Sequence, residues 1–443
     1  LGLSYRIDSN GKVVDPEDEP YYKSVRDAAP AAGKPLNELF GNVNIENSDS
    51  GEITMDNDSA VGMFVKNNSN DEVAGVFAVN DPDNRKTKDE TIGVNKGTIT
   101  INGGNGSVGM GADNGKITND KNTAPAAPGK INVVGTKSAG MYGTNNSELI
   151  NNGIINVAAT SVGSESIGMF INDKDSTIKN AGTINVGKHS YGIYGRKVNM
   201  TGGLIDVDDD GVGVYSTGPN VSLSAGTINV ADNNAVGVYI ADDPDNSQDT
   251  NVVSGVDMTV GDTDSFGYLI TATQAKTDLT IKPTTNPVHL GEKSVYVYSQ
   301  APKSLGGKIV NSSDVITDKN NGYAIYSSQD SENHGYIDLR SGKGNIGIYS
   351  TEGIGKNAKD GVIEVGLSDV FTKQFGIGMA TGYYNESSKV SSNMGTVENH
   401  GTINVANQNS VRYKVKNLHL RVCCWKWLKG NKCKRWSDKS KWK

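Results

Sequence analysis

The sequence has little cysteine or tryptophan, and none of either before its last 33 residues. The three cysteines are Cys423, Cys424 and Cys433. Residues 1–410 therefore have no disulfide framework and no thiolate metal site. No run reaches the ~18–20 apolar residues that a membrane-spanning helix needs. No signal peptide is visible, and because the chain starts with Leu1 rather than Met we expect a targeting segment to be missing from this fragment.

The charge is unevenly distributed along the chain. The net charge is −7, but the residues from Val411 onward hold 12 Lys and Arg and a single acid, Asp438, which leaves −18 for residues 1–410. An acidic body favours solubility and disfavours nucleic acid as a partner. Only 35% of the residues are hydrophobic and 54 are Gly. Disorder or short strands with many turns would each give this composition, and the repeated apolar positions favour strands.

A repeat fills most of the chain. Gly182-Thr183-Ile184-Asn185-Val186 is followed by Ser190-Tyr191-Gly192-Ile193-Tyr194. Related copies start at Gly51, Gly97, Gly129, Gly153, Gly182, Gly203, Gly226, Gly255, Gly307, Gly335, Gly361 and Gly401, with a degenerate copy near Val288. A third apolar piece, such as Thr177–Asn180, precedes many copies. One repeat is therefore predicted to be about three short strands with turns between them.

The alternation within each strand predicts how the repeats stack. In Thr183–Val186 the apolar pair shares one face, because strand side chains have a period of two. One such strand cannot bury its apolar face alone, but successive coils can stack Ile on Ile and Val on Val. We predict an all-β fold, a right-handed parallel β-helix of roughly 13 coils over residues 41–410. Residues 1–40 are predicted to be an irregular lead-in or linker.

The tail over residues 411–443 departs from the repeat. A functional basic, Trp-rich arm that contacts lipid or nucleic acid is one interpretation. A frameshift is the favoured one, because reading one nucleotide forward turns every Trp codon into a Gly codon. Residues 435–442 then accommodate the opening strand of the repeat. In that case the tail is out of frame and disordered, and the natural protein continues with more repeats.

The tandem Gly-Thr-Ile-Asn-Val and Ser-x-Gly-Ile-Tyr strands resemble the passenger region of Gram-negative autotransporters (type V secretion), and especially the surface adhesins of fusobacterial type. The resemblance covers about residues 41–410. It implies an export signal, a β-helical passenger outside the cell and outer-membrane attachment through a C-terminal β-barrel, and this sequence contains neither signal nor barrel. The implied location is the cell surface, either anchored to the outer membrane or secreted.

One aromatic residue recurs near the end of each repeat. This column consists of Tyr142, Phe170, Tyr194, Tyr215, Tyr239, Leu269, Tyr298, Tyr326 and Tyr349. By strict alternation, Tyr194 is predicted to share a strand face with Gly192, opposite Ile193. If that face is outward, the rings of all these residues except Leu269 form a stripe that could bind glycan or protein. The alternative is that the rings stack on one another and stabilise the rod.

No catalytic or metal site is predicted. The five histidines (His189, His289, His334, His400 and His419) are isolated and expected in solvated loops. The Gly-x-Ser-x-Gly motif of serine hydrolases is absent. The acidic runs Asp206–Asp210 and Asp242–Asp245 could hold Ca²⁺, but they lack the calcium-loop pattern and are expected to be solvated turns. No cofactor is expected.

The sequence therefore favours a non-enzymatic passenger fragment, an adhesin or structural stalk. Its partners are expected to be host-cell or bacterial surface proteins or glycans, contacted through loops and the aromatic strand face. A β-helical polysaccharide-degrading enzyme is the alternative, and it predicts a cleft with at least two close carboxylates and sugar-stacking rings. A third hypothesis, a membrane or nucleic-acid binder driven by the tail, requires residues 411–443 to be genuine.

Overall fold

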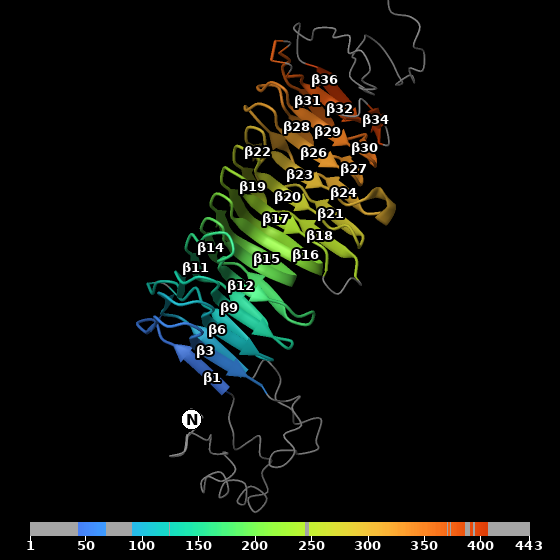
Figure 1. Cartoon of the computed structure of the whole chain (residues 1–443). Helices are drawn as coiled ribbons and strands as arrows, with labels where there is room; N and C mark the ends of the chain where they lie inside the picture. Colours follow the sequence, from blue (N-terminus) through green and yellow to red (C-terminus); the bar gives the residue numbers. More distant parts are fainter. Residues whose placement is uncertain are drawn as a thin grey trace, which may run out of the picture.

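In a computed structural model of the chain, the described residues form an elongated rod of stacked strands (Figure 1). The structure describes residues 43–67, 91–123, 125–243, 248–369, 371–372, 374–385, 390–392 and 395–405. The predicted lead-in, residues 1–40, and the predicted tail, residues 411–443, lie outside the described residues. No helix in the described ranges is long and apolar enough to cross a membrane.

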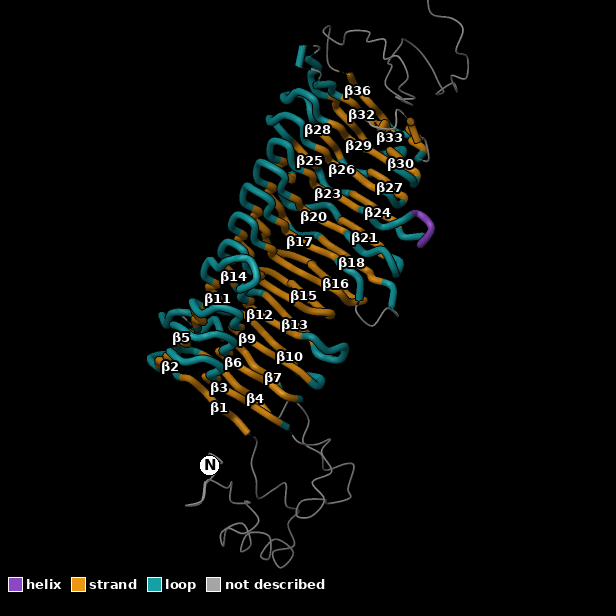
Figure 2. The backbone as a smooth tube through the Cα atoms, in the orientation of Figure 1, coloured by secondary structure: helices purple, strands orange, loops and turns teal. Residues whose placement is uncertain are grey.

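The rod is a right-handed parallel β-helix, which confirms the predicted fold. Each coil contributes three strands, and each strand pairs in parallel with its equivalents in the coils before and after it (Figure 2). The strands thus form three columns along the rod, here called the opening, aromatic and amide columns. Thirteen strands stack in the opening column of the described residues, which agrees with the predicted count.

The opening column contains β2 (Glu52–Met55), β5 (Thr98–Ile101), β8 (Lys130–Val133), β11 (Ile154–Val157), β14 (Thr183–Val186), the ends of β15 (Tyr191–Val207) and β16 (Val212–Val230), β19 (Asp257–Val260), β22 (Val288–Leu290), β25 (Val315–Ile316), β28 (Tyr336–Asp338), β31 (Val362–Val365) and β36 (Thr402–Val405). The aromatic column contains β3 (Val61–Lys66), β6 (Val108–Asp113), β9 (Ala139–Thr144), β12 (Ile167–Ile171), the beginnings of β15 and β16, β17 (Val236–Ile240), β20 (Phe266–Ile270), β23 (Val295–Ser299), β26 (Tyr323–Ser327), β29 (Ile346–Ser350) and β32 (Ile377–Thr381).

The amide column contains β1 (Val43–Asn47), β4 (Thr91–Asn95), β7 (Lys116–Asn119), β10 (Glu148–Asn151), β13 (Thr177–Asn180), the middle parts of β15 and β16, β18 (Thr250–Ser254), β21 (Thr277–Ile281), β24 (Lys308–Asn311), β27 (Asp330–Asn333), β30 (Ile354–Asn357) and β35 (Thr396–Asn399). Outside the columns lie the 3₁₀ helix η4 (Lys303–Leu305) and a two-stranded antiparallel pair, β33 (Tyr383–Asn385) and β34 (Val390–Ser392).

The core is continuous along the axis because inward residues pair with the same or a similar apolar residue on the next coil. Ile155, Ile184, Ile205 and Ile228 are in register on successive coils, and each is wholly buried. Burying an isoleucine side chain stabilises the fold by about 1.5–3 kcal/mol relative to leaving it exposed. The residue between two inward residues of one strand, such as Asn185 between Ile184 and Val186, is partly exposed. The predicted inward orientation of Ile184 and Val186 is thereby confirmed.

One predicted copy of the repeat is assigned to the wrong column. The strand after Gly307 is β24, which pairs with β21 and β27 in the amide column. The opening strand of that coil is β25, whose two residues, Val315 and Ile316, are too short for the alternation to stand out. Gly-x-apolar-polar spacing alone does not separate two columns that share the same period of two.

Short polar residues turn the chain between the opening and aromatic columns. Asp210, Asn233, Asn234 and Asp264 take positive φ values between 54° and 60° there. Asn and Asp tolerate this left-handed conformation better than other side chains do. Asn233 and Asn234 therefore suit the two consecutive left-handed positions of their corner.

Candidate functional site

The alternation of inward and outward positions is interrupted at glycine in the aromatic column. Ile193 is wholly buried, whereas Tyr194 is partly exposed. A Cβ on Gly192 would lie 2.6 Å from the Gly213 carbonyl oxygen and 2.9 Å from Val186 Cγ2, so this position also points into the core. Two consecutive inward positions are followed by the outward ring. The prediction that Tyr194 shares a face with Gly192 is therefore wrong, because two consecutive inward positions break strict alternation.

The register places all nine residues of the predicted column on successive coils. Each is paired with the next, from Tyr142 with Phe170 to Tyr326 with Tyr349. All nine are partly exposed: Tyr142, Phe170, Tyr194, Tyr215, Tyr239, Leu269, Tyr298, Tyr326 and Tyr349. The sequence pattern thus located a real surface column, although the repeat length varies from coil to coil.

The rings form two stacks that are separated at Leu269. In the first, the Tyr194 and Tyr215 centroids are 4.7 Å apart and those of Tyr215 and Tyr239 are 4.9 Å apart, with planes 14° and 10° from parallel. In the second, Tyr326 lies 5.0 Å from Tyr298 and 4.9 Å from Tyr349. Aromatic pairs add about 0.5–1.5 kcal/mol beyond area burial. The stacks therefore stabilise the rod, as the alternative interpretation expected.

Three further rings pack edge-on against these stacks. Tyr191 lies 5.8 Å from Tyr215, Phe266 lies 5.5 Å from Tyr298 and Tyr323 lies 5.6 Å from Tyr326, with planes 66° to 86° apart. They stand three residues before the column position on their strands. The equivalent residues on other coils, such as Val212, are aliphatic. Sequence reasoning missed this second row. It lies two residues before the inward apolar residue of each strand, as Tyr191 does before Ile193, and a search at that spacing would have found it.

The aromatic face carries no charge. From β9 to β32 the four residues of each strand that end at the column position, such as Tyr191–Tyr194, include no charged residue. Four tyrosine hydroxyls of this face are held in the neutral form by raised pKa values. Burial and neighbouring phenol groups raise the pKa of Tyr215 to about 12, and burial raises the pKa of Tyr191, Tyr194 and Tyr323 as well.

Stacking limits what the face can contact. Parallel rings less than 5.1 Å apart cover one another, so a sugar ring has no free face between them. Ring edges and hydroxyls remain at the surface, and some hydroxyls are already engaged. Tyr239 Oη accepts a bond of 3.1 Å from Thr271 Oγ1, and Tyr298 Oη accepts one of 3.1 Å from Gln300 Nε2. The face can therefore act as a flat apolar docking surface with regularly spaced phenols.

The acidic runs make protein contacts. Asp210 binds Lys188 at 3.0 Å, and this hydrogen-bonded pair lowers the pKa of the carboxyl. Asp243 is buried against the Arg196 guanidinium. Asp242 accepts bonds from the backbone of Thr273 and Gln274. Among the described residues, no three His, Cys, Asp or Glu side chains form a group that could hold a metal ion.

A shallow hollow lies beside the opening column. Its volume is about 400 Å³, and its polar lining includes Asn185, Asp206, Asp208 and Asn229. Asp206 accepts a 3.3 Å bond from Asn229. The ten residues that line the hollow include no aromatic ring, so it lacks the sugar-stacking part of the cleft that the enzyme hypothesis predicts.

The histidines differ in their surroundings. His334 Nδ1 lies 2.8 Å from Asp360 Oδ1, and His400 Nε2 lies 3.3 Å from Glu398 Oε2. His189 is 3.9 Å from Asp210. His289 is exposed, but the prediction that it lies in a loop is wrong, because it is the middle residue of strand β22. His419 lies outside the described residues.

Sequence reasoning missed the main polar feature inside the rod, a ladder of asparagine amides at the inward end of the amide column. Each Nδ2 donates to the Oδ1 of the next coil at 2.8–3.1 Å. The first ladder consists of Asn47, Asn95, Asn119, Asn151 and Asn180, and the second of Asn311, Asn333, Asn357 and Asn399. Asn two residues before a Gly, as in Asn151–Gly153, is a sequence signal that marks five of these nine asparagines.

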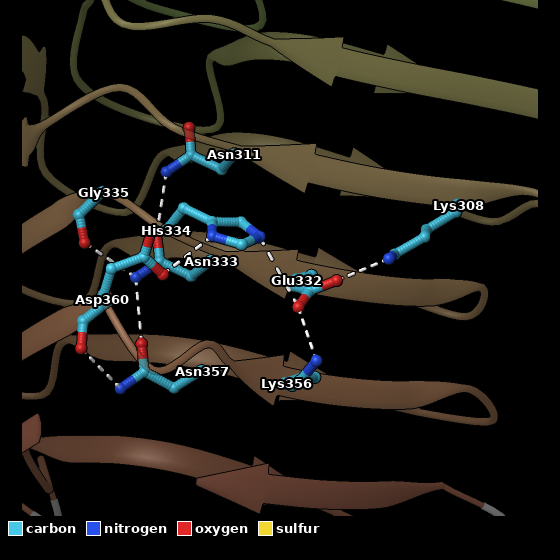
Figure 3. A network of polar contacts seen from close by, with 10 residues as sticks. Lys308, Asn311, Glu332, Asn333, His334, Gly335, Lys356, Asn357 and Asp360 are labelled. Atoms are coloured by element: carbon cyan, nitrogen blue, oxygen red, sulfur yellow. Dashed lines mark hydrogen bonds and ion pairs between the residues drawn. The ribbon is translucent and has the colours of Figure 1, made fainter. Parts of the chain in front are cut away.

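Charged rungs lie on the outer face of the same column (Figure 3). Lys308 and Lys356 bind the two oxygens of Glu332 at 2.5 and 2.6 Å. Burial alone would raise the pKa of Glu332, but these two ammonium groups outweigh it and lower the value to about 2. Glu148 is paired in the same way with Lys179 and, at 3.9 Å, with Lys116. The rungs tie neighbouring coils together, and no catalytic pair of carboxylates is formed by them.

Comparison with known proteins adds one solved structure. No family model matches the chain, and no curated protein matches it. The chain is similar to a crystal structure of a TibC-catalyzed hyper-glycosylated TibA fragment, residues 55–350, at 13% identity and a TM-score of 0.25. The match covers 82% of this chain and 97% of that chain. A likeness this weak says nothing about what the chain binds.

Proposed function

We propose that the chain is a non-enzymatic β-helical scaffold displayed outside the cell, a passenger of autotransporter type whose aromatic face docks on a partner. The observation that carries the proposal is the uncharged row of partly exposed aromatic and aliphatic side chains along the rod. Large apolar surface patches are uncommon on proteins that work alone and mark interaction sites. The assignment to the autotransporter class is based on the resemblance of the sequence repeats to the passenger region of autotransporters.

The geometry favours a protein surface over a glycan as the partner. The stacked faces of Tyr194, Tyr215 and Tyr239 are turned toward one another, which leaves edges and hydroxyls for contact. Charged corner residues such as Asp210 and Lys293 border the apolar centre. Protein interfaces commonly have this arrangement of an apolar centre and a polar rim.

Adhesion measurements test the proposal. Fluorescent beads coated with the purified chain would be incubated with epithelial cells, and bound beads counted. We expect the triple variant Tyr194→Ser, Tyr215→Ser and Tyr239→Ser to reduce binding at least about fivefold, because interface aromatics contribute most of the binding energy. The matched control replaces Asn156, Asn185 and Asn229 by Ser, since these outward residues lie on the opening column and are also partly exposed.

Both variants must keep the β-sheet circular dichroism and cooperative melting of the parent chain. Equal binding by folded parent and folded Tyr variant would reject the aromatic face as the docking surface. The alternative, a polysaccharide-degrading enzyme, is tested by measuring release of reducing ends from a panel of polysaccharides. Activity that disappears in Asp206→Asn and Asp208→Asn would replace the scaffold proposal, because these two acids line the hollow.

A further inference from the structure

Buried polar side chains gather inside the rod where the chain passes from the aromatic column to the amide column. Thr277 begins β21, Gln329 directly precedes β27, and Ser331 lies within it. None of the three is more than 1% exposed. On neighbouring coils the register places Ile309 and Gly355 opposite Ser331, whereas Thr250, which is also polar and buried, lies opposite Thr277.

Gln329 and Thr277 approach each other across a missing side chain. The register puts Gly307 between them, because Leu279 pairs with Ile309 and Lys308 pairs with Asp330. A Cβ on Gly307 would lie 2.9 Å from Gln329 Oε1 and 2.3 Å from the Thr277 carbonyl oxygen. The glutamine amide thus occupies the space that a side chain at position 307 would fill.

The polar atoms of this cluster have no protein partner. Gln329 Oε1, Gln329 Nε2, Thr277 Oγ1 and Ser331 Oγ are buried and make no hydrogen bond to the described protein. The backbone beside them is satisfied, since Ser327 Oγ donates to the Gln329 carbonyl at 2.8 Å. Each buried polar group without a partner destabilises a protein substantially, so four in one place require a partner.

We propose that this cluster is an internal hydration site, in which ordered water bridges Gln329 to Thr277 and Ser331. Water both donates and accepts, and buried water usually makes about three hydrogen bonds to otherwise unsatisfied groups. The cluster offers one amide donor, one amide acceptor and two hydroxyls, which fits that demand. A cation is a poorer match, because none of the four atoms is charged. The site is independent of the aromatic face and of the proposed function.

Substitution of Gln329 distinguishes a hydrated site from a dry one by the sign of its effect. Gln329→Met keeps the side-chain length but removes both polar atoms. If water bridges the cluster, the change leaves the water or the two hydroxyls without partners, and Tm falls by about 2–4 °C. If the amide is buried dry, the change removes an uncompensated polar group, and Tm rises instead.

The matched control is Gln274→Met, because Gln274 is exposed. The Tm of this variant should equal that of the parent chain. A crystal structure at better than ~2 Å resolution gives the direct test. A water within hydrogen-bond distance of the Gln329 amide and of Thr277 Oγ1 would support the proposal. A cluster without water, or a higher Tm for Gln329→Met, would overturn it.

Discussion

The two ends of the rod and its middle fill the same inward position of the amide column in different ways. Toward both ends the position is asparagine, and the amides form the two ladders. Between Asn180 and Asn311 the register places Met200, Leu223, Ser254 and Ile281 there instead. The strands of the amide column pair in parallel from coil to coil in both regions. The β-helix therefore accepts either a fully paired polar row or an apolar row, provided that no amide is left alone.

The second ladder begins with a specific cap. Asn311 has no amide on the preceding coil, and Ser313 Oγ donates to its Oδ1 at 2.8 Å. Tyr296 Oη meets the same hydroxyl at 3.0 Å. Tyr268, one coil earlier, donates to Ser254 Oγ at 2.6 Å. Two buried tyrosines thus satisfy serine hydroxyls, Tyr268 in the middle region and Tyr296 at the start of the second ladder.

The largest expected effect breaks the ladder. Asn151→Leu removes the acceptor of Asn119 Nδ2 and the donor to Asn180 Oδ1, both wholly buried. We expect a loss of about 2–5 kcal/mol in the free energy of unfolding, measured by urea denaturation. Met200→Leu, at the same column position in the middle, should cost less than about 1.5 kcal/mol. Similar losses for the two variants would show that the ladder makes no special contribution.

The opening column should be equally stable beside the first ladder and in the middle of the rod. Ile184→Ala and Ile228→Ala each empty a wholly buried position of the opening column, one beside the first ladder and one in the middle. Both should destabilise the chain by about 2–4 kcal/mol in urea denaturation, because the transfer and cavity terms are the same. A loss confined to one of them would mean that the core differs as well.

A smaller effect is expected from the buried tyrosines. Tyr268→Phe leaves Ser254 Oγ without its donor and should cost about 1–2 kcal/mol. Burial raises the pKa of Tyr268 from 10.0 to about 12, so the folded state favours the neutral phenol. Its contribution is complete below pH 10 and is lost as the pH rises toward 12. The difference in Tm between parent and variant should shrink over that range, and a constant difference would contradict it.

The smallest effect concerns the charged rungs outside the second ladder. The pKa of Glu332 is lowered from 4.5 to about 2, so its stabilising contribution is complete above pH 4.5 and is lost as the pH falls toward 2. Because both lysines are substantially exposed, we expect only about 1 kcal/mol. Thermal melts of the parent and of Glu332→Gln should differ at pH 6 and converge near pH 2. Parallel pH profiles would show that the rung contributes nothing.

Much of the fold could be read from the sequence because it is local and repeated. The alternation in Thr183–Val186 identifies the inward residues, and the recurrence of Tyr194 and its equivalents predicts the register of the aromatic column. The strand after Gly307 was misplaced because two columns share that alternation. Gly192 is misplaced because it is a second consecutive inward position beside Ile193, which a strict period of two does not predict.

The sequence by itself determined the repeat, the three strands in each coil and the uncharged aromatic column. These follow from a period of two that every coil restates. Only the tertiary structure decided which rings face outward and stack, which asparagines pair across coils, and that Gln329 meets Thr277 across Gly307. Those contacts join residues 21 to 52 positions apart, and loops of unequal length set which residues meet, so no local pattern contains them.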